Sequence, residues 1–110
     1  MQPLTTIEDL NRALQTPGLL LIFKHSTRCP ISGAAFHRFS KYVEESGGAL
    51  PPACVINVVE ARAVSNEAAN RFGVTHQSPQ LILVRDGVAI WNTSHGGITA
   101  EAIQNALSLP

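Results

Sequence analysis

Three short apolar runs alternate with helix-like segments along this chain, and this alternation restricts the possible fold more than any other feature. The runs are Leu19–Phe23, residues 53–59 and residues 81–84. The second run has no regular apolar–polar alternation, which is typical of a strand covered on both faces. Because a helical pattern separates the first two runs, we expect parallel strands joined by a right-handed crossover.

The segments outside these runs carry the signals that start helices. Thr5 followed by Glu8 has the pattern of a capping box. Proline is favoured at the first helical position, because its missing N–H donor costs nothing there. The residues expected to cap or open the four helices are Thr5, Pro30, Ser65 and Thr99.

The last part of the chain predicts a hairpin. Asp86-Gly87 is a favoured two-residue turn, and it would join residues 81–84 to an antiparallel strand over Val88–Thr93. The whole order predicts an α/β, thioredoxin-like fold. We expect a mixed four-stranded sheet (βαβαββα with an extra N-terminal helix) flanked by helices, in a single domain over residues 1–110.

Composition excludes several classes of function. The formal net charge is zero, so nothing suggests a field that would attract nucleic acid or a membrane. The apolar runs are far shorter than the ~20 residues that a membrane-spanning helix needs. The N-terminus lacks the basic and apolar regions of a signal peptide, so we expect a cytoplasmic protein. Two cysteines make neither a disulfide framework nor a complete metal site.

Cys29 stands at the point where a buried strand and a short loop lead into the Pro30 helix. The unpaired N–H groups of a helix start favour negative charge, so a thiol placed there is expected to ionise easily and to react. Ser32 lies one turn into the helix, could donate a hydrogen bond to the thiolate, and cannot form a disulfide, so the chemistry would be monothiol. Three nitrogen-bearing side chains flank the cysteine: Lys24, His25 and Arg28.

Two later loops carry further candidates. Ser78-Pro79 comes directly before the third strand, where a cis-proline of a thioredoxin-like fold would face the thiol, and Gln77 and Ser78 would pair with the substrate backbone. Ser94 and His95 follow the fourth strand, beside the proline loop, and His95 could bind an anion or transfer a proton.

The remaining cysteine, histidines and tryptophan have plainer interpretations. Cys54 lies in an apolar run and is expected to be a small buried residue. His37 is expected on the surface of the second helix, whereas His76 could border the site. Trp91 could form a wall of the groove, although packing in the core or at the sheet edge is at least as well supported.

The segment His25–Ser32, together with Ser78-Pro79-Gln80 and Trp91–His95, resembles the YtxJ-type monothiol bacilliredoxins over nearly the whole chain. The resemblance implies a cytoplasmic thioredoxin-like protein that removes bacillithiol from protein cysteines after oxidative stress. It implies that Cys29 attacks, that Ser32 replaces a resolving cysteine and that Pro79 is the cis-proline. Bacillithiol would then be a co-substrate, with no tightly bound cofactor, and the clients would be bacillithiolated proteins.

The residues fit such a ligand, because bacillithiol carries carboxylates. Lys24, His25, Arg28 and His95 are expected to give a positive rim around the thiol.

Two other functions stay open. Monothiol glutaredoxins with Cys-x-x-Ser hold an iron–sulfur cluster between two protomers, although Pro30 stands where they have glycine. A redox-inert adaptor would bind partner peptides along the Ser78-Pro79 edge and would not need Cys29.

Overall fold

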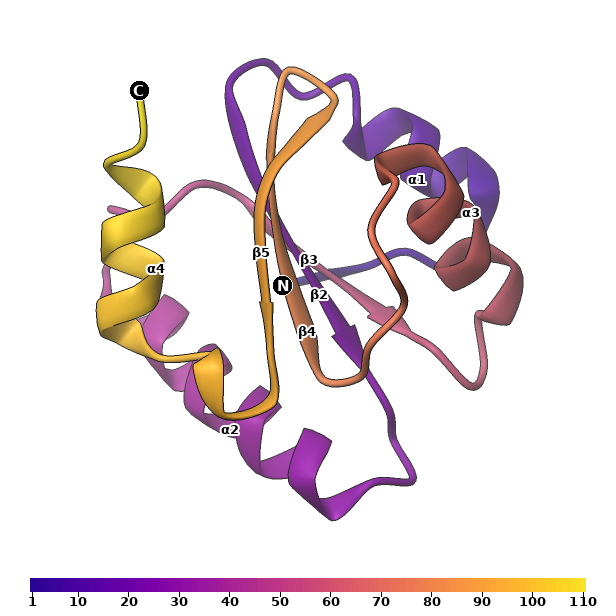
Figure 1. Cartoon of the computed structure of the whole chain (residues 1–110), viewed down its shortest axis with the longest axis horizontal. Coiled ribbons are helices and arrows are strands. Elements are labelled where there is room, and N and C mark those ends of the chain that lie inside the picture. Colours follow the sequence, from indigo (N-terminus) through magenta and orange to yellow (C-terminus); the bar gives the residue numbers. More distant parts are fainter.

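The sheet of the computed structural model, which describes residues 1–110, has five strands in the order β1-β3-β2-β4-β5 (Figure 1). Strands β1, β3 and β2 are parallel to one another, and the β2–β4 and β4–β5 pairs are antiparallel. The fold class and the parallel β2–β3 pair are therefore as predicted. The strands are β1 (Gln2–Pro3), β2 (Leu19–His25), β3 (Ala53–Asn57), β4 (Gln80–Arg85) and β5 (Val88–Ser94).

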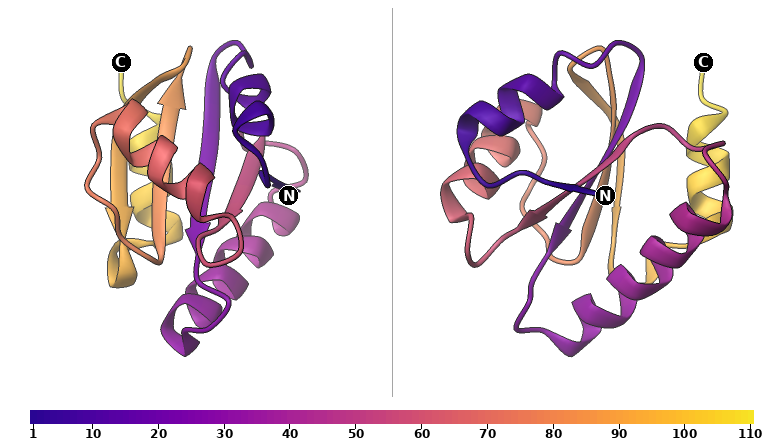
Figure 2. Two further views of the ribbon diagram at one scale, coloured as in Figure 1. Left: turned by 90° about the vertical axis from the view of Figure 1, so that its right-hand side faces the viewer. Right: turned by 180° about the vertical axis from the view of Figure 1, so that it is seen from behind.

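Helices cover both faces of this sheet. Figure 1 shows α1 and α3 together on one side and α2 and α4 on the other, and the two further views of Figure 2 show the same division. None of the helices combines the length and the apolar character that crossing a membrane requires. The helices are α1 (Ile7–Ala13), α2 (Pro30–Glu45), α3 (Arg62–Phe72) and α4 (Ala100–Leu107), and a 3-10 turn, η1 (His95–Gly97), precedes α4.

Strand β2 divides the core into two halves, because successive side chains of a strand point to opposite faces. Leu20 and Ile22 belong to the apolar cluster under α1 and α3, whereas Leu21 and Phe23 belong to the cluster under α2 and α4. Phe23 also stacks on Phe39 of α2, with ring centroids 5.2 Å apart. Lys24 and His25, the last two residues of β2, continue this alternation. Lys24 therefore lies on the face of α1 and α3, and His25 lies on the face of α2 and α4.

The prediction of four strands is wrong by one, because β1 was missed. This strand has only two exposed residues, Gln2 and Pro3, which pair with Cys54 and Val55 of β3. Leu4 follows β1 and is almost fully buried. A two-residue strand carries no periodic pattern, so only its tertiary partner makes it a strand.

Two predicted helix starts are also wrong. The N-cap of α1 is Thr6, whose hydroxyl accepts from Asp9 N–H at 3.1 Å, and the capping box pairs Thr6 with Asp9. Helix α3 begins at Arg62, three residues before the expected Ser65 cap. Ser65 is instead buried against the sheet. The predicted start of α2 at Pro30 and the Thr99 cap of α4 are confirmed.

The strand directions bring four segments to one end of the sheet. Strands β2, β3 and β5 end there and β4 begins there, as follows from their parallel and antiparallel pairings. The register places His25 beside Asn57, and Gln80 between Lys24 and Ser94. The loops that follow β2 and β5 and the loop that precedes β4 therefore meet at this end.

Candidate active site

Cys29 is the N-cap residue of α2, and Pro30 occupies the first turn, as the sequence predicts. The backbone of Cys29 is extended (φ −111°, ψ 118°), and its carbonyl accepts from Gly33 N–H at 2.9 Å. Its side chain makes no capping hydrogen bond and is partly buried. The sulfur thus lies at the positive end of a 16-residue helix with no protein partner.

Ser32 is fully buried, and its hydroxyl forms hydrogen bonds with His25 and Ser26. Ser32 Oγ lies 2.8 Å from His25 Nδ1 and accepts from Ser26 N–H at 2.9 Å. The expected hydrogen bond from Ser32 to the Cys29 thiolate is thus replaced by bonds to the end of β2 and to the loop after it.

His25 does not belong to a positive rim, contrary to expectation. Its ring is buried and stacks on Phe36 of α2, with centroids 4.5 Å apart and planes 14° from parallel. Burial lowers the pKa of His25, and the nearby Glu60 carboxylate offsets only part of that shift. Because the pKa lies below its ordinary value of 6.5, the imidazole is neutral at pH 7.

Lys24 does not belong to that rim either, because it is fully buried under α3. Its ammonium donates to Ser65 O at 3.2 Å, and no carboxylate pairs with it. Burial lowers the pKa of Lys24 from 10.5 to about 8. Of the expected basic rim, the structure leaves Arg28 and His95 exposed.

A second set of contacts holds the loop between β2 and α2. Thr27 Oγ1 donates to the Glu60 carboxylate at 2.6 Å, and Cys29 N–H donates to Ser26 O at 3.3 Å. Val58 N–H donates to His25 O at 2.9 Å. Sequence reasoning missed Glu60, because 33 residues separate it from Thr27 and no local motif marks the pair.

The loop before β4 lies at the same end of the sheet. The Ser78–Pro79 peptide bond is cis. The side chain of Gln80, also buried, donates to Thr75 O at 3.1 Å and accepts from Gln77 N–H at 3.3 Å. Ser78 Oγ is buried without a hydrogen-bond partner.

The loop after β5 joins this arrangement, because His95 N–H donates to Pro79 O at 3.1 Å. His95 is exposed and has a positive φ of 51°. Ser94 pairs with Gln80 across the sheet. The predicted neighbourhood of the Ser94-His95 loop and the proline loop is therefore confirmed.

The other singled-out residues lie away from the sulfur or in the core. Cys54 is buried in the cluster under α1 and α3, and burial raises the pKa of its thiol. Trp91 packs against the cluster under α2 and α4. His37 is exposed on α2, and His76 Nδ1 lies 3.5 Å from Ser65 Oγ.

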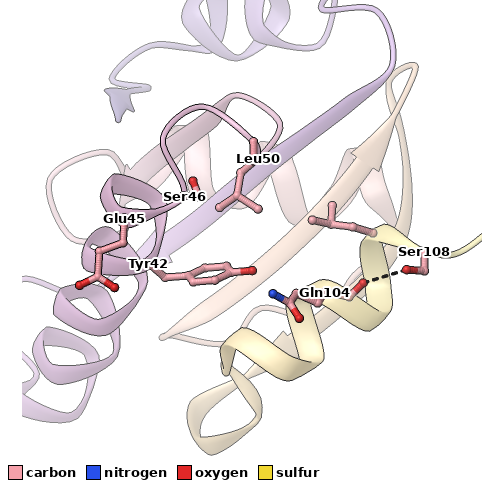
Figure 3. A pocket seen from close by; sticks show the side chains of 8 residues that line it. Tyr42, Glu45, Ser46, Leu50, Gln104 and Ser108 are labelled. Carbon is pink, nitrogen blue, oxygen red and sulfur yellow. Dashed lines mark hydrogen bonds between the residues drawn. The ribbon is translucent and has the colours of Figure 1, made fainter.

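The largest cavity is at the other end of α2 from Cys29. Its volume is about 630 Å³, and Figure 3 shows Tyr42 and Leu50 on one side of it and Gln104 and Ser108 of the α4 segment on the other. A 16-residue helix is roughly 24 Å long, so this cavity is remote from the thiol. No group of three or more His, Cys, Asp or Glu side chains is gathered as a metal site.

The whole chain is similar to solved thioredoxins. It matches the thioredoxin of Fasciola hepatica with a TM-score of 0.77 and 14% identity, over 98% of this chain and 97% of that one. It matches oxidised mitochondrial thioredoxin 3 of Saccharomyces cerevisiae with a TM-score of 0.74 and 17% identity, over 96% and 92% of the two chains. The fold and the thiol at the helix start define a thioredoxin-fold protein with one cysteine in its motif.

A comparison with protein families assigns the chain to a narrower group than the thioredoxin fold does. The family described as Monothiol bacilliredoxin BrxC matches residues 2–103, so this chain belongs to the monothiol bacilliredoxins. A structure provisionally described as an oxidoreductase with a thioredoxin fold has a TM-score of 0.88 and 27% identity, over 97% of this chain and 93% of that one. Family and fold together support a role in thiol redox chemistry.

Proposed function

We propose that this protein is a monothiol thiol–disulfide exchange enzyme that takes bacillithiol from bacillithiolated client proteins onto Cys29. The observation that carries the proposal is the free sulfur of Cys29 at the start of α2, in a member of the monothiol bacilliredoxin family. The activity belongs in the cytoplasm, where small thiols are kept reduced. Bacillithiol is the co-substrate, and no tightly bound cofactor is required.

The exchange has two steps that balance. The Cys29 thiolate attacks the bacillithiol sulfur of the client mixed disulfide, a new S–S bond forms, and the client leaves as a thiolate that takes up a proton. A second small thiol, as thiolate, then attacks the disulfide on Cys29 and releases Cys29 as a thiolate. The small-thiol disulfide that leaves carries the oxidising equivalents away.

The lack of a resolving cysteine supports this monothiol route. Ser32 occupies the position of a second motif cysteine, and Cys54 is buried in the core on the face of α1 and α3. Burial also raises the pKa of the Cys54 thiol, which disfavours its reactive form. The small thiol must therefore come from solution.

The ligand contacts that we propose are those left accessible at this end of the sheet. Arg28 and His95 are exposed and would meet the carboxylates of bacillithiol. Gln77 is exposed, and Gln77 and Ser78, which precede Pro79, would pair with the substrate backbone. The loop around Pro79 is joined to the His95 loop by a backbone hydrogen bond, so His95 and the Gln77-Ser78 segment lie side by side.

The test compares the two cysteines as matched variants. We expect Cys29→Ala to abolish release of bacillithiol from a bacillithiolated model protein, and Cys54→Ser to keep most of it, as measured by mass spectrometry of the client. Intact-mass analysis of the wild type should show one bacillithiol adduct, on Cys29. An active Cys29→Ala variant would contradict the proposal and would favour a redox-inert adaptor.

A further inference from the structure

A continuous set of hydrogen bonds connects the end of β2 to the residue that carries the thiol. His25 Nδ1 lies 2.8 Å from Ser32 Oγ, and Ser26 N–H donates to the same oxygen at 2.9 Å. Ser26 O then accepts from Cys29 N–H at 3.3 Å. Three bonds thus lead from the imidazole of His25, through Ser32 and Ser26, to Cys29.

The direction of the first bond follows from the inventory of donors and acceptors. A serine hydroxyl has one proton to donate, and a buried O–H group needs an acceptor. The only acceptor that lies within bonding distance of the Ser32 hydroxyl is His25 Nδ1. The hydroxyl therefore donates to Nδ1, which leaves its oxygen free to accept Ser26 N–H, and the imidazole carries its own proton on Nε2.

We propose that His25 is a positioning residue for the exchange reaction, because its Nδ1 orients the Ser32 hydroxyl and thereby fixes the Ser26–Cys29 loop at the start of α2. The inference rests on the proposed function only in assigning the reaction to Cys29. A thiol that is displaced from its attack geometry by about an ångström can lose up to roughly a hundred-fold in rate, so a loosened loop has a measurable cost.

The hydrogen bond can be separated from the packing of the ring. His25 stacks face to face on Phe36, and this contact uses the face of the ring and not Nδ1. His25→Phe keeps an aromatic ring for that contact and removes the acceptor. His25→Asn removes the ring and places an acceptor oxygen close to the position of Nδ1. The two variants therefore separate the hydrogen bond of His25 from the stacking of its ring on Phe36.

The experiment measures how fast Cys29 reacts with 2,2′-dithiodipyridine, in a Cys54→Ser background so that one thiol is observed. We expect His25→Phe and Ser32→Ala each to slow this reaction roughly ten-fold, and His25→Asn to stay within about three-fold of wild type. The His25→Phe/Ser32→Ala double variant should be no slower than Ser32→Ala alone, because Ser32→Ala already removes the bond that His25→Phe removes. The Ser26 amide should also exchange its hydrogen faster in His25→Phe.

Two results would overturn the inference. One is a His25→Phe variant with the wild-type rate, and the other is a His25→Asn variant as slow as His25→Phe, which would assign the effect to ring packing. If His25→Phe did not fold, His25→Leu, which lacks both the ring and the acceptor, would be compared with His25→Asn, which lacks only the ring, and equal rates of these two variants would overturn the inference. The reagent contains no bacillithiol, so a failure of the proposed substrate leaves this test valid, and an inactive wild-type thiol would refute the proposed function itself.

Discussion

At the scale of single residues, Lys24 and His25 show how tertiary structure changes the role of a side chain. Both are basic residues close to a cysteine, and sequence reasoning assigned both to a positive rim. In the fold they are the last two residues of a buried strand, and alternation directs them to opposite faces. Each is buried and bonded to a helix of its own face, Lys24 to α3 and His25 to α2.

Lys24 should make the protein more stable as the pH rises above about 8. The pKa of Lys24 is about 8 in the fold and 10.5 ordinarily, so between these values the folded protein has lost a proton that the unfolded chain keeps. Stability rises with pH wherever the unfolded state binds more protons. We therefore expect the free energy of unfolding of Lys24→Met, measured in urea, to lack the rise that wild type shows between pH 8 and pH 9.

The matched control for this prediction is Lys41→Met, because Lys41 is exposed and is the only other lysine. Lys41→Met should leave the pH dependence of the free energy of unfolding unchanged.

We also expect Lys24→Met to be more stable than wild type at pH 7, since an apolar side chain replaces a buried charge that has no carboxylate partner. A destabilised Lys24→Met variant would mean that its bond to Ser65 outweighs the burial of the charge.

At the scale of elements, the turn between β5 and α4 depends on a close contact that sequence patterns do not reveal. Gly96 and Gly97 are adjacent and both lie in η1. A β-carbon on Gly97 would collide with Thr93 Oγ1, whereas one on Gly96 would meet open space. The two glycines therefore have different tolerance for a side chain.

We expect Gly97→Ala to destabilise the protein by about 1 kcal/mol, at the low end of the usual cost of added atoms that force a neighbour to move, because Gly97 is exposed and the Thr93 side chain must turn away. Gly96→Ala should change the free energy of unfolding by less than about 0.5 kcal/mol. Thr93→Ala combined with Gly97→Ala should recover much of the loss, because the colliding hydroxyl is gone. Equal effects of the two single glycine variants in urea denaturation would contradict the contact.

At the scale of the whole molecule, His25 and His76 connect folding to pH. Burial lowers the pKa of His25 and of His76, and Lys24 and Arg62 lower the pKa of His76 further. Below the ordinary value of 6.5 the unfolded chain therefore binds more protons than the folded one. Stability must then fall as the pH drops through this value.

We expect the free energy of unfolding to be lower at pH 5 than at pH 7, in a range that keeps most carboxylates ionised. His76→Gln and His25→Asn should each reduce this difference, because each removes one group with a lowered pKa. His37→Gln changes an exposed histidine on α2 and is the control. Equal free energies of unfolding of the wild type at pH 5 and pH 7, measured in urea, would contradict the lowered pKa values of His25 and His76.

Much of the fold and one part of the site could be predicted from local patterns. Apolar runs, Asp86-Gly87 and Pro30 are short-range signals, and they identified four of the five strands and the start of α2. Cys29 was found for the same reason, since a cysteine directly before a proline that opens a helix is visible in two adjacent residues. The two-residue strand β1 and the Thr27–Glu60 contact have no local signal.

Local sequence patterns were enough to predict every helix, every strand except β1, and the thiol at a helix start, because these features depend on neighbours a few residues away. Two features became visible only in the folded protein: Lys24 and His25 are buried, and Ser32 bonds to His25 and not to the sulfur. The physical reason is that burial and long-range hydrogen bonds depend on which elements cover a side chain, and strand register across the sheet fixes that choice.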